Sequence, residues 1–459
     1  IKSELCKGLE KSMCGWRIFR NLSFLQNRFN LIFKETIIAF FLKICGVALT
    51  FFLNVLIARQ FGANMTGVFF LSLTTASAAS IFGCIGLENT FIRYTSASVA
   101  HNDWSSIKGM YRKGLQLSLP FSILLTILIV IFSRLIAEHF FYKPETAAII
   151  RLMAMAILPT VLIYLHAELL KGIQRIAYYF LVHSIGVPAL SILAFIVLCV
   201  QLDMGIKGVA WGHLIATSIT ATLGVGLWRL FTKNKMEGVV GDFHWQQLLR
   251  SSLPLFWVNL MNFIMMWSSM LFLGIWGTND EVGIYATAYR TSMLTSFILI
   301  AVNTVAAPKY AEYYSCNQMK RLEETALTSL KMMFVLAVPP LVVFIIFPHW
   351  IMGFFGSDFM KGGMCLSILA CGQFVNVATG SVGYILMMSG HEHLLRNAIT
   401  LSAVSNLLLN LWLVPRYGIV GGAVATAVSL SMLNLVSAYY VWTQVKIKPL
   451  PLPFISSRY

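Results

Sequence analysis

Charged residues are scarce in this sequence. Asp, Glu, Lys and Arg together make up 11% of its 459 residues, whereas soluble domains carry roughly 25%. Hydrophobic residues reach 58%, and the mean hydropathy is +0.76. A water-soluble fold would have too little polar surface to cover so much apolar core. The composition therefore excludes a soluble protein and predicts that most of the chain lies in lipid.

The motifs of several enzyme and pump classes are missing. No Gly-rich loop runs into Lys and Ser or Thr, so ATP-driven transport is not indicated. The eight cysteines form no C-x-x-C pair and show no zinc-ligand spacing, and we expect no metal site, disulfide framework or cofactor. The longest predicted outer connection, roughly 134–146, is too short for a soluble active site. A membrane polysaccharide polymerase or ligase is thus disfavoured, and the chain is predicted not to be an enzyme.

Acidic residues are missing from the interior of the apolar stretches. Glu88 and Glu168 lie at stretch ends, and Glu168 has Lys171 beside it. Interfacial pairing is a simpler interpretation of both than proton transfer. Exporters of drugs or metabolites that are coupled to cations usually need a carboxylate within the membrane. The absence of an intramembrane carboxylate argues against such an exporter. It does not indicate which ion, if any, is coupled to transport.

The chain does contain twelve long apolar stretches. Most reach the length of about 20 residues that crosses about 30 Å of hydrocarbon. Membrane barrels would instead show alternating segments of roughly ten residues. The sequence therefore predicts an all-α membrane protein with twelve transmembrane helices, at 37–58, 66–87, 114–136, 147–170, 177–201, 206–231, 248–275, 282–307, 326–348, 361–389, 396–414 and 418–443.

The second six stretches repeat the first six at an offset of about 215 residues. Gly67-Val68-Phe69 recurs as Gly283-Ile284-Tyr285, and the Gly-Ile-x-Gly-x-Ala pattern of 205–210 recurs at 418–423. Because six is an even number, both halves enter the membrane from the same side. The sequence predicts two parallel six-helix repeats related by an axis along the membrane normal.

The net charge of +16 is a topology signal. If both termini lie inside, the inner segments carry 25 Lys and Arg and the outer connections carry 6. This positive-inside bias predicts that both termini are cytoplasmic, and nucleic acid is not expected as a partner. The predicted domains are a basic cytoplasmic leader (1–36), an N-terminal six-helix lobe (37–231), a cytoplasmic linker (232–247), a C-terminal six-helix lobe (248–443) and a cytoplasmic tail (444–459).

Four cations are the candidate substrate-binding residues. Lys43 lies within the first stretch, and Arg59, Arg151 and Arg290 lie towards the outer side. Guanidinium groups keep their charge and bind phosphate with two parallel hydrogen bonds. A cavity lined by these four side chains would hold an anion. The alternatives are snorkelling to the interface or pairing with a carboxylate. The histidines His166, His183 and His213 are dispersed and show no metal-ligand spacing.

Besides the four cations, polar residues at helical spacing are predicted to line the cavity. Thr50 and Asn54 share a helix face with Lys43, and Asn259 and Asn262 lie on the repeat-related seventh stretch. Interhelical hydrogen bonding is an equally good interpretation of any single asparagine. The further candidates are Tyr289, Gln373, Asn376 and Asn406.

Three segments resemble the polysaccharide transporter family of Wzx-type oligosaccharide flippases. They are Ile57-Ala58-Arg59-Gln60-Phe61-Gly62 with Gly67-Val68-Phe69, Gly283-Ile284-Tyr285 with Tyr289-Arg290, and Asn406 to Ala423 with its Leu413-Val414-Pro415 and Tyr417-Gly418-Ile419. The wider superfamily includes multidrug and toxin extrusion (MATE) proteins and the lipid II flippase. The resemblance covers about residues 35–445.

The resemblance implies a MATE-like pair of six-helix lobes around a central cavity that opens alternately to either side. It implies a bacterial cytoplasmic membrane protein that flips undecaprenyl-diphosphate-linked oligosaccharide repeat units for O-antigen (lipopolysaccharide), capsule or exopolysaccharide synthesis. Membrane lipid and the polymerase and chain-length machinery are the expected partners. The alternatives are a cation-coupled exporter of the same superfamily and a membrane scaffold for the assembly machinery.

Overall fold

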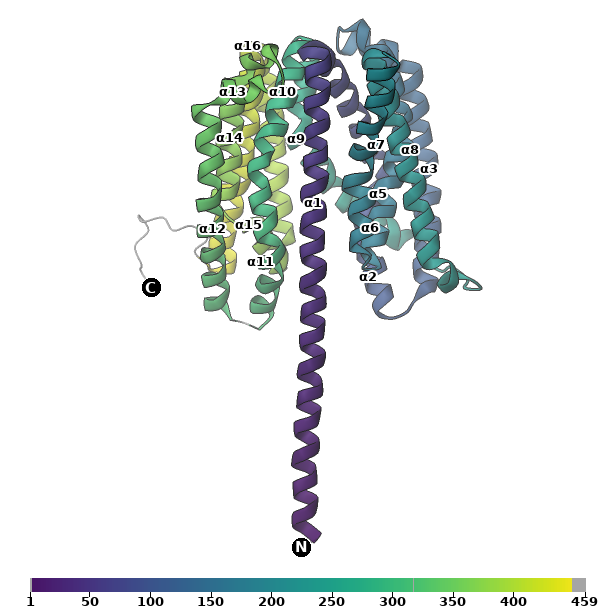
Figure 1. Ribbon diagram of the computed structural model, residues 1–459, viewed down its shortest axis with the longest axis vertical. Helices are drawn as coiled ribbons and strands as arrows, with labels where there is room; N and C mark the ends of the chain where they lie inside the picture. The colour runs from purple at the N-terminus through teal and green to yellow at the C-terminus, as the bar shows by residue number, and fades with distance from the viewer. Residues whose placement is uncertain (1, 317, 448–459) are drawn as a thin grey trace.

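The computed structural model describes the backbone of residues 2–316 and 318–447. Side chains are described from residue 38 to residue 447, except at 300, 301, 304, 305, 308, 315 and 317. Within these ranges every regular element is helical (Figure 1). The prediction of an all-α fold is confirmed. The side chains of the predicted leader 1–36 and most of the predicted tail 444–459 lie outside the described residues.

The first half of the chain holds eight α-helices with short π- and 3-10 segments between them. They are α1 (Lys2–Cys84), α2 (Leu87–Ala100), α3 (Trp104–Leu135), η1 (Ile136–Phe140), η2 (Pro144–Thr146), α4 (Ala147–Met155), α5 (Ile157–Gly172), α6 (Ile176–Phe180), η3 (Leu181–Ile185), α7 (Gly186–Phe195), η4 (Ile196–Gln201) and α8 (Gly205–Met236). The connection at 134–146 is largely helical, because α3 continues into η1 and η2 follows.

The second half has the same character. Its elements are α9 (Trp245–Trp276), α10 (Asn279–Ser292), η5 (Met293–Ser296), α11 (Phe297–Ser315), α12 (Met319–Ile346), α13 (Pro348–Gly353), η6 (Ser357–Gly362), α14 (Gly363–Ala378), α15 (Val382–Met388), α16 (Glu392–Tyr440) and η7 (Val441–Val445). We call α1–α8 the N-terminal bundle and α9–α16 the C-terminal bundle.

Two of the longest helices contain a sharp turn at a glycine. Gly62 interrupts α1 with φ 69° and ψ −177°, and Gly418 interrupts α16 with φ 53° and ψ −130°. A side chain at either φ would clash with its own backbone, which is why glycine is found there. Each helix therefore consists of two helical segments that meet at an angle.

Eight helices among the described residues are long and apolar enough to cross a membrane, or nine if the bent pair Ser357–Ala378 and Val382–Met388 counts as one span. Two of the eight, Ile38–Cys84 and Glu392–Val445, have 47 and 54 residues, about twice the length that a bilayer requires. The outward faces of α3 and α12 carry exposed apolar side chains such as Ile131 (64% exposed) and Val335 (68%). These faces are suited to lipid, as the composition predicted.

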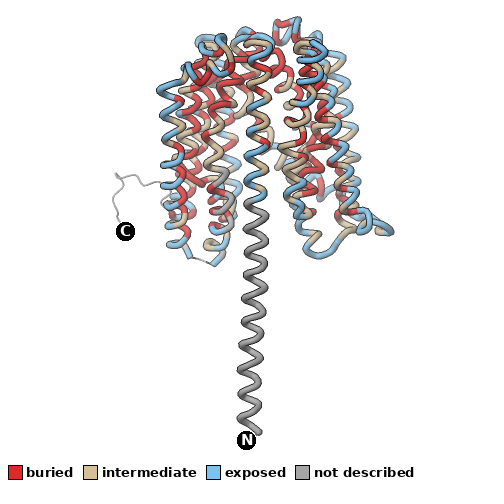
Figure 2. The backbone as a smooth tube through the Cα atoms, viewed as in Figure 1, coloured by how far each residue is buried: buried red, intermediate tan, exposed pale blue. Residues whose placement is uncertain are grey.

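The two bundles lie side by side, and the long α1 of the N-terminal bundle runs between the other helices of that bundle and the C-terminal bundle (Figure 1). Buried residues concentrate where helices face one another, and exposed residues cover the outer surfaces of both bundles (Figure 2). The largest cluster of buried apolar residues includes members of both bundles, such as Phe70 and Leu71 of α1 with Met270 and Leu273 of α9. The bundles are thus joined by a packed interface.

Glycines from both halves form the tightest contact between the bundles. A Cβ atom on Gly67 would lie 1.8 Å from the Asn279 carbonyl oxygen, and one on Gly283 would lie 2.1 Å from that of Ala63. Gly67 and Ala63 precede Gly283 and Asn279 by the same 216 positions. Reciprocal contact between equivalent residues is what a twofold axis between two repeats produces. We call this contact the glycine seam.

Polar contacts surround the glycine seam and also join the two bundles. The Asn279 side chain donates to Glu145 (2.6 Å), Asn64 donates to Asp280 (3.4 Å) and Arg59 donates to the carbonyl oxygen of Phe354 (2.7 Å). The seam therefore closes the interface at the end of the molecule where Gly62 turns the chain.

Candidate functional site

A cavity of about 250 Å³ lies between the two bundles. Elements α1, α5, η3, α7 and α8 line it from the N-terminal bundle, and α9 and α10 line it from the C-terminal bundle. No carboxylate is among the lining residues that the structure describes. The lining residues with polar atoms are Thr74, Ser77, Ser80, Thr160, Tyr164, His183, His213, Thr217, Trp267 and Arg290.

Arg290 provides the only permanent charge among these described lining residues. Its guanidinium carbon lies 4.3 Å from the ring centroid of Phe70 and 5.4 Å from that of Trp267. Its Nε atom is buried and has no hydrogen-bond partner among the described residues. The Arg290 side chain is half-buried, and its two cation–π contacts, worth about 1–2 kcal/mol, come from neutral rings. Its charge therefore has no acidic partner among the described residues and is available to an anion in the cavity.

The local structure holds Arg290 firmly. A capping box starts α10, in which the Thr278 hydroxyl accepts from the Glu281 amide (3.2 Å) and the Glu281 carboxylate accepts from the Thr278 amide (2.8 Å). Every residue from Val282 to Tyr289 is buried, because α10 packs against α1 on one side and α14 on another. A helix this enclosed leaves Arg290 little freedom to move away from the cavity.

Tyr289 lies behind the cavity wall and supports it. Its ring stacks on Tyr285 at 6.2 Å and meets the edge of Trp267 at 5.7 Å. Tyr285 is in turn hydrogen-bonded to Thr426 of α16 at 2.8 Å. The predicted polar residue Tyr289 is therefore placed one layer from the lining, where it orients the Trp267 ring that contacts Arg290.

Two histidines face the same cavity from different helices. His213 on α8 meets the Phe69 ring edge-on at 6.4 Å, and His183 on η3 stacks on Tyr179 at 5.0 Å. The three histidines were expected to be dispersed. His183 and His213 instead line one cavity, although they are 30 residues apart in sequence. Protonation of either imidazole would add to the positive charge of the cavity.

The third histidine has a structural role. His166 is fully buried, with Nδ1 2.8 Å from the carbonyl oxygen of Leu162 and Nε2 3.1 Å from the Tyr111 hydroxyl. Because a carbonyl can only accept, Nδ1 must donate and Nε2 accepts from Tyr111. His166 is satisfied as a neutral ring and does not line the cavity.

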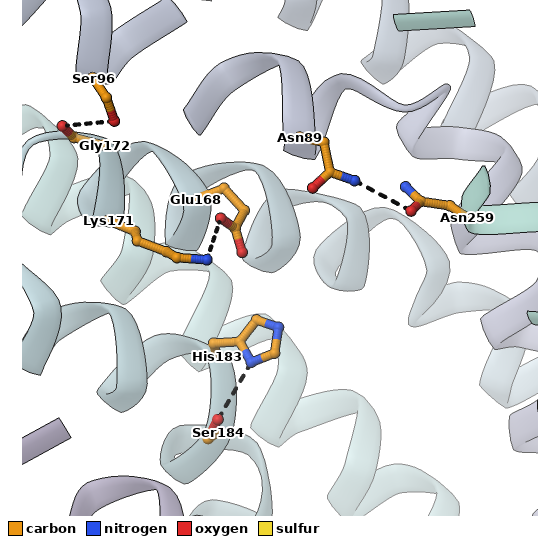
Figure 3. A network of polar contacts seen from close by, with 8 residues as sticks. All are labelled: Asn89, Ser96, Glu168, Lys171, Gly172, His183, Ser184 and Asn259. Atoms are coloured by element: carbon orange, nitrogen blue, oxygen red, sulfur yellow. Dashed lines mark hydrogen bonds and ion pairs between the residues drawn. The ribbon is translucent and has the colours of Figure 1, made fainter. Parts of the chain in front are cut away.

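A polar cluster adjoins the cavity on the N-terminal bundle (Figure 3). Lys171 pairs with Glu168 at 3.1 Å and lies 4.9 Å from the Tyr179 ring centroid. His183, which stacks on the same Tyr179 ring, is 3.3 Å from the Ser184 hydroxyl. The predicted pairing of Glu168 with Lys171 is confirmed. The cluster extends the polar surface away from Arg290.

Lys43 lies next to this cluster but not among the residues that line the cavity. A Cβ atom on Gly46 would be 2.7 Å from the Ser184 carbonyl oxygen, so α1 presses closely on η3 at this point. Lys43 precedes Gly46 by three residues and shares its helix face. The Lys43 side chain is half-buried, and Thr50 donates its hydroxyl hydrogen to the carbonyl oxygen of Gly46 (2.8 Å).

The remaining predicted cations lie away from the cavity. Arg59 is exposed and reaches across the interface to Phe354. Arg151 is exposed and donates to the Ser133 hydroxyl at 3.3 Å. Of the four candidate cations, only Arg290 lines the described cavity. The substrate-binding roles of the others stay predictions.

The predicted polar residues occupy several separate places. Asn54 is buried on α1, and Asn262 is half-buried on α9. Asn259 bonds to Glu88 and Asn89 of the other bundle. Gln373 accepts hydrogen bonds from Ser296 and, at 3.4 Å, from Asn376. The structure does not bring these five residues into the described cavity.

Asn406 belongs to a buried amide network between α9 and α16. It accepts from Ser268, donates to the Ala425 carbonyl oxygen at 3.2 Å, and accepts from Asn410 at 3.0 Å. Losing one member leaves several buried groups unpaired, which costs about 1–3 kcal/mol.

We expect Asn406→Ala to lower the thermal unfolding midpoint of the purified protein in detergent by several degrees, whereas Ser431→Ala should not. Ser431 lies on the same helix and donates only to its own backbone, at Ala427 (2.7 Å). An Asn406→Ala protein as stable as wild type would contradict the packing role.

Sequence reasoning missed most of the cavity lining. Thr74, Ser77 and Ser80 recur every third residue on α1, and His213 and Thr217 are four residues apart on α8. Both spacings place side chains on one helix face and were available as signals. Among the described residues there is no group of three or more His, Cys, Asp or Glu side chains that could hold a metal ion.

A family model described as "Polysaccharide biosynthesis protein" matches residues 32–314, more than half of the chain. The chain belongs to this polysaccharide biosynthesis protein family. A second model, described as MatE, matches residues 254–412. The predicted family and superfamily are confirmed.

Relatives and solved structures agree with this assignment. The "Probable low-salt glycan biosynthesis flippase Agl15" of Haloferax volcanii is 25% identical over 420 residues, which cover 90% of this chain and 84% of the relative. The inward-facing structure of a multidrug resistance MATE family transporter of the MOP superfamily has a TM-score of 0.72 at 15% identity and covers 90% and 98% of the two chains. The inward closed structure of the lipid II flippase MurJ has a TM-score of 0.71 at 18% identity and covers 90% and 88%.

These structural likenesses establish a MATE-like fold. Together with the apolar helices, they show that this member of the polysaccharide biosynthesis protein family is a multi-pass membrane protein.

Proposed function

We propose that this protein is a flippase that moves lipid-linked oligosaccharides across a membrane by alternating access. The observation that carries the proposal is the guanidinium of Arg290, which is half-buried in a polar cavity between two bundles and whose buried Nε has no hydrogen-bond partner among the described residues. Two curated relatives from Haloferax volcanii are named as probable flippases, one of them for glycan biosynthesis. The family match adds support from an independent comparison.

The cavity chemistry favours an anionic head group over a cationic drug. The described lining contains one fixed cation, two imidazoles and no carboxylate. In a low-dielectric interior such a site attracts phosphate strongly and repels cations. The oligosaccharide and phosphate would stay in the polar cavity while the polyprenyl tail remains in lipid. A cation-coupled multidrug exporter, the competing function within the superfamily, would need the opposite polarity.

We further propose twelve spans in two six-helix lobes. Cutting α1 at Gly62 and α16 at Gly418 yields two spans from each, and α10–α11 and α14–α15 count as one bent span each. The reciprocal contact of Gly67 and Gly283 supports the twofold relation between the lobes. Both termini would then lie on the cytoplasmic side, with the linker.

The proposed substrate carrier is a polyprenyl phosphate or diphosphate. The resemblance named undecaprenyl diphosphate in a bacterial cytoplasmic membrane and O-antigen, capsule or exopolysaccharide as the product. The two relatives named as flippases come from an archaeon, so the phosphate-bearing polyprenyl class is the part that their names support. Polysaccharide polymerase and chain-length proteins are the proposed partners, because they consume the flipped lipid.

Deleting the gene in its source organism tests this proposal. We expect lipid-linked oligosaccharides to accumulate on the cytoplasmic leaflet and surface glycan to disappear, since a charged, hydrated head group cannot cross hydrocarbon unaided. The wild-type gene should restore both. Normal surface glycan, together with new sensitivity to cationic drugs, would instead identify the exporter.

A further inference from the structure

Two kinds of hydroxyl group line the cavity between the bundles. The hydroxyls of Ser77, Ser80 and Thr217 donate to carbonyl oxygens of their own helices, at 2.8, 2.9 and 2.9 Å. A hydroxyl that donates in this way has no hydrogen left for a ligand. Thr160 and Tyr164 also line the cavity, but neither of their hydroxyls has a hydrogen-bond partner among the described residues.

These two hydroxyls belong to a larger set of unused polar groups. Thr160 and Tyr164 are four residues apart on α5, so their side chains share one helix face. His213 on α8 packs edge-on against the Phe69 ring at 6.4 Å, and neither of its ring nitrogens has a hydrogen-bond partner among the described residues. All three side chains are half-buried and come from the N-terminal bundle. This wall of the cavity therefore offers free donors and acceptors to a ligand.

The wall from the C-terminal bundle has a different chemistry. It provides the fixed positive charge of Arg290 and the indole of Trp267. On the N-terminal wall a hydroxyl carries no charge, and a neutral imidazole has one donor and one acceptor. Such groups do not neutralise a phosphate, but they match the hydroxyl groups of a sugar, each of which both donates and accepts. The two walls thus suit the two parts of a glycosyl phosphate.

Trp267 lies where these two parts would meet. Its ring centroid is 5.4 Å from the guanidinium carbon of Arg290, and the Tyr289 ring supports it at 5.7 Å. The Trp267 side chain is half-buried, and its Nε1 has no hydrogen-bond partner among the described residues. An indole offers an apolar face and one donor, and a pyranose ring has an apolar C–H face with hydroxyls around its rim. A sugar bonded to a phosphate at Arg290 would therefore pack well against Trp267.

The size of the cavity limits what it holds. Its volume is about 250 Å³, just below the range of about 300–1,000 Å³ that is usual for pockets of small-molecule ligands. This volume suits a phosphate with one sugar ring and is too small for a whole oligosaccharide. The remaining sugars of the repeat unit would extend beyond the described cavity.

We propose that Thr160, Tyr164 and His213 form a sugar subsite. They bind the ring that is bonded to the phosphate of the lipid, and Trp267 packs against a face of that ring. This inference rests on the proposed function, because it requires a glycosyl phosphate in the cavity. In this arrangement the C-terminal bundle binds the phosphate and the N-terminal bundle binds the sugar. A lipid phosphate without its sugar would contact the C-terminal wall alone.

Binding of soluble fragments of the head group tests the subsite. The purified full chain would be incubated in detergent with radiolabelled inorganic phosphate or with the 1-phosphates of glucose, galactose and N-acetylglucosamine. Scintillation proximity would measure the bound label. We expect at least one sugar phosphate to bind about tenfold more tightly than inorganic phosphate, because the sugar adds hydrogen bonds to the N-terminal wall. The readout is binding, so the result does not depend on flipping.

Two substitutions each remove one hydroxyl and keep the shape of the side chain. Tyr164→Phe and Thr160→Val should each weaken sugar phosphate binding roughly 2- to 10-fold and leave inorganic phosphate binding unchanged. Because neither hydroxyl has a partner among the described residues, both variants should fold. The matched control is Thr222→Val on α8, an exposed position whose hydroxyl donates to the Ile219 carbonyl oxygen at 2.8 Å. Both affinities of this control should equal those of wild type.

Arg290→Gln separates the subsite from the anion site, since it should weaken binding of sugar phosphates and inorganic phosphate alike. Equal binding of the two ligands to wild type would overturn the subsite and leave the anion site standing. A sugar preference that persists in the double variant of Tyr164→Phe and Thr160→Val would do the same. Weaker inorganic phosphate binding in either hydroxyl variant would assign these groups to the phosphate instead. If wild type binds neither ligand, the anion site of the proposed function is wrong as well.

Discussion

Replacing Arg290 with glutamine is expected to reduce flipping of a lipid-linked oligosaccharide by about 100-fold. The guanidinium makes no ion pair among the described residues, and its Nε lacks a partner, so its hydrogen-bonding capacity is free for the head group. A charge-assisted contact to phosphate contributes about 3 kcal/mol, which corresponds to roughly 100-fold in affinity. Initial flipping rates in reconstituted vesicles at low substrate concentration measure the effect.

Two companion variants separate charge from geometry. Arg290→Lys keeps the positive charge but loses the planar fork, so we expect an intermediate loss of about tenfold. Arg134→Gln removes an exposed arginine that pairs with Glu138 and should flip at the wild-type rate. Wild-type flipping by Arg290→Gln would remove Arg290 from the site.

The empty protein offers a second readout of the same substitution. A half-buried cation whose buried Nε has no partner destabilises the folded state, so Arg290→Gln should unfold at a higher temperature than wild type when no substrate is present. A purely structural arginine would give the opposite result. Higher stability combined with lost activity is expected if Arg290 serves to bind the substrate and does not stabilise the fold.

Gly67→Ala is expected to abolish flipping by preventing closure of the glycine seam. The added Cβ would lie 1.8 Å from the Asn279 carbonyl oxygen. That atom belongs to the backbone of a fully packed helix, so it cannot move aside as a flexible side chain could. The bundles can separate as rigid bodies instead, so we expect the variant to fold and to remain open at this end.

Spin labels at His139 and Lys361, exposed positions on η1 and η6, should show a longer distance in Gly67→Ala than in wild type. The matched control is Gly226→Ala on α8, where an added Cβ would meet nothing within 4 Å. It should flip normally. Normal flipping by Gly67→Ala would contradict the requirement for a closed seam.

The repeat and the family could be recognised from sequence because both depend on local patterns. Apolar length and glycine spacing are properties of consecutive residues, and they identified Gly67 and Gly283 as equivalent. They did not indicate that these two glycines touch. That contact depends on how the two bundles are placed, which no spacing within one helix encodes.

The candidate site was harder to predict for the same reason. Arg59, Arg151 and Arg290 look alike in sequence, yet only Arg290 lies on a helix enclosed on several sides. His183 and His213 come from different helices, and only packing of η3 and α8 around one space brings them together. Glu88 was interpreted as an interfacial acid from its place at the end of an apolar stretch, and nothing in that stretch indicated that it would accept a hydrogen bond from Asn259, 171 positions away.

The most direct measurement compares head groups in vesicles that contain the purified protein. The account predicts that the protein accelerates flipping of a labelled polyprenyl-diphosphate oligosaccharide, and that inorganic pyrophosphate inside the cavity competes with it. The same lipid with an uncharged linkage in place of the phosphates should flip no faster than in protein-free vesicles. Equal acceleration of the charged and uncharged lipids, or acceleration of neither, would contradict the claim that an unpaired cation between the bundles selects an anionic cargo.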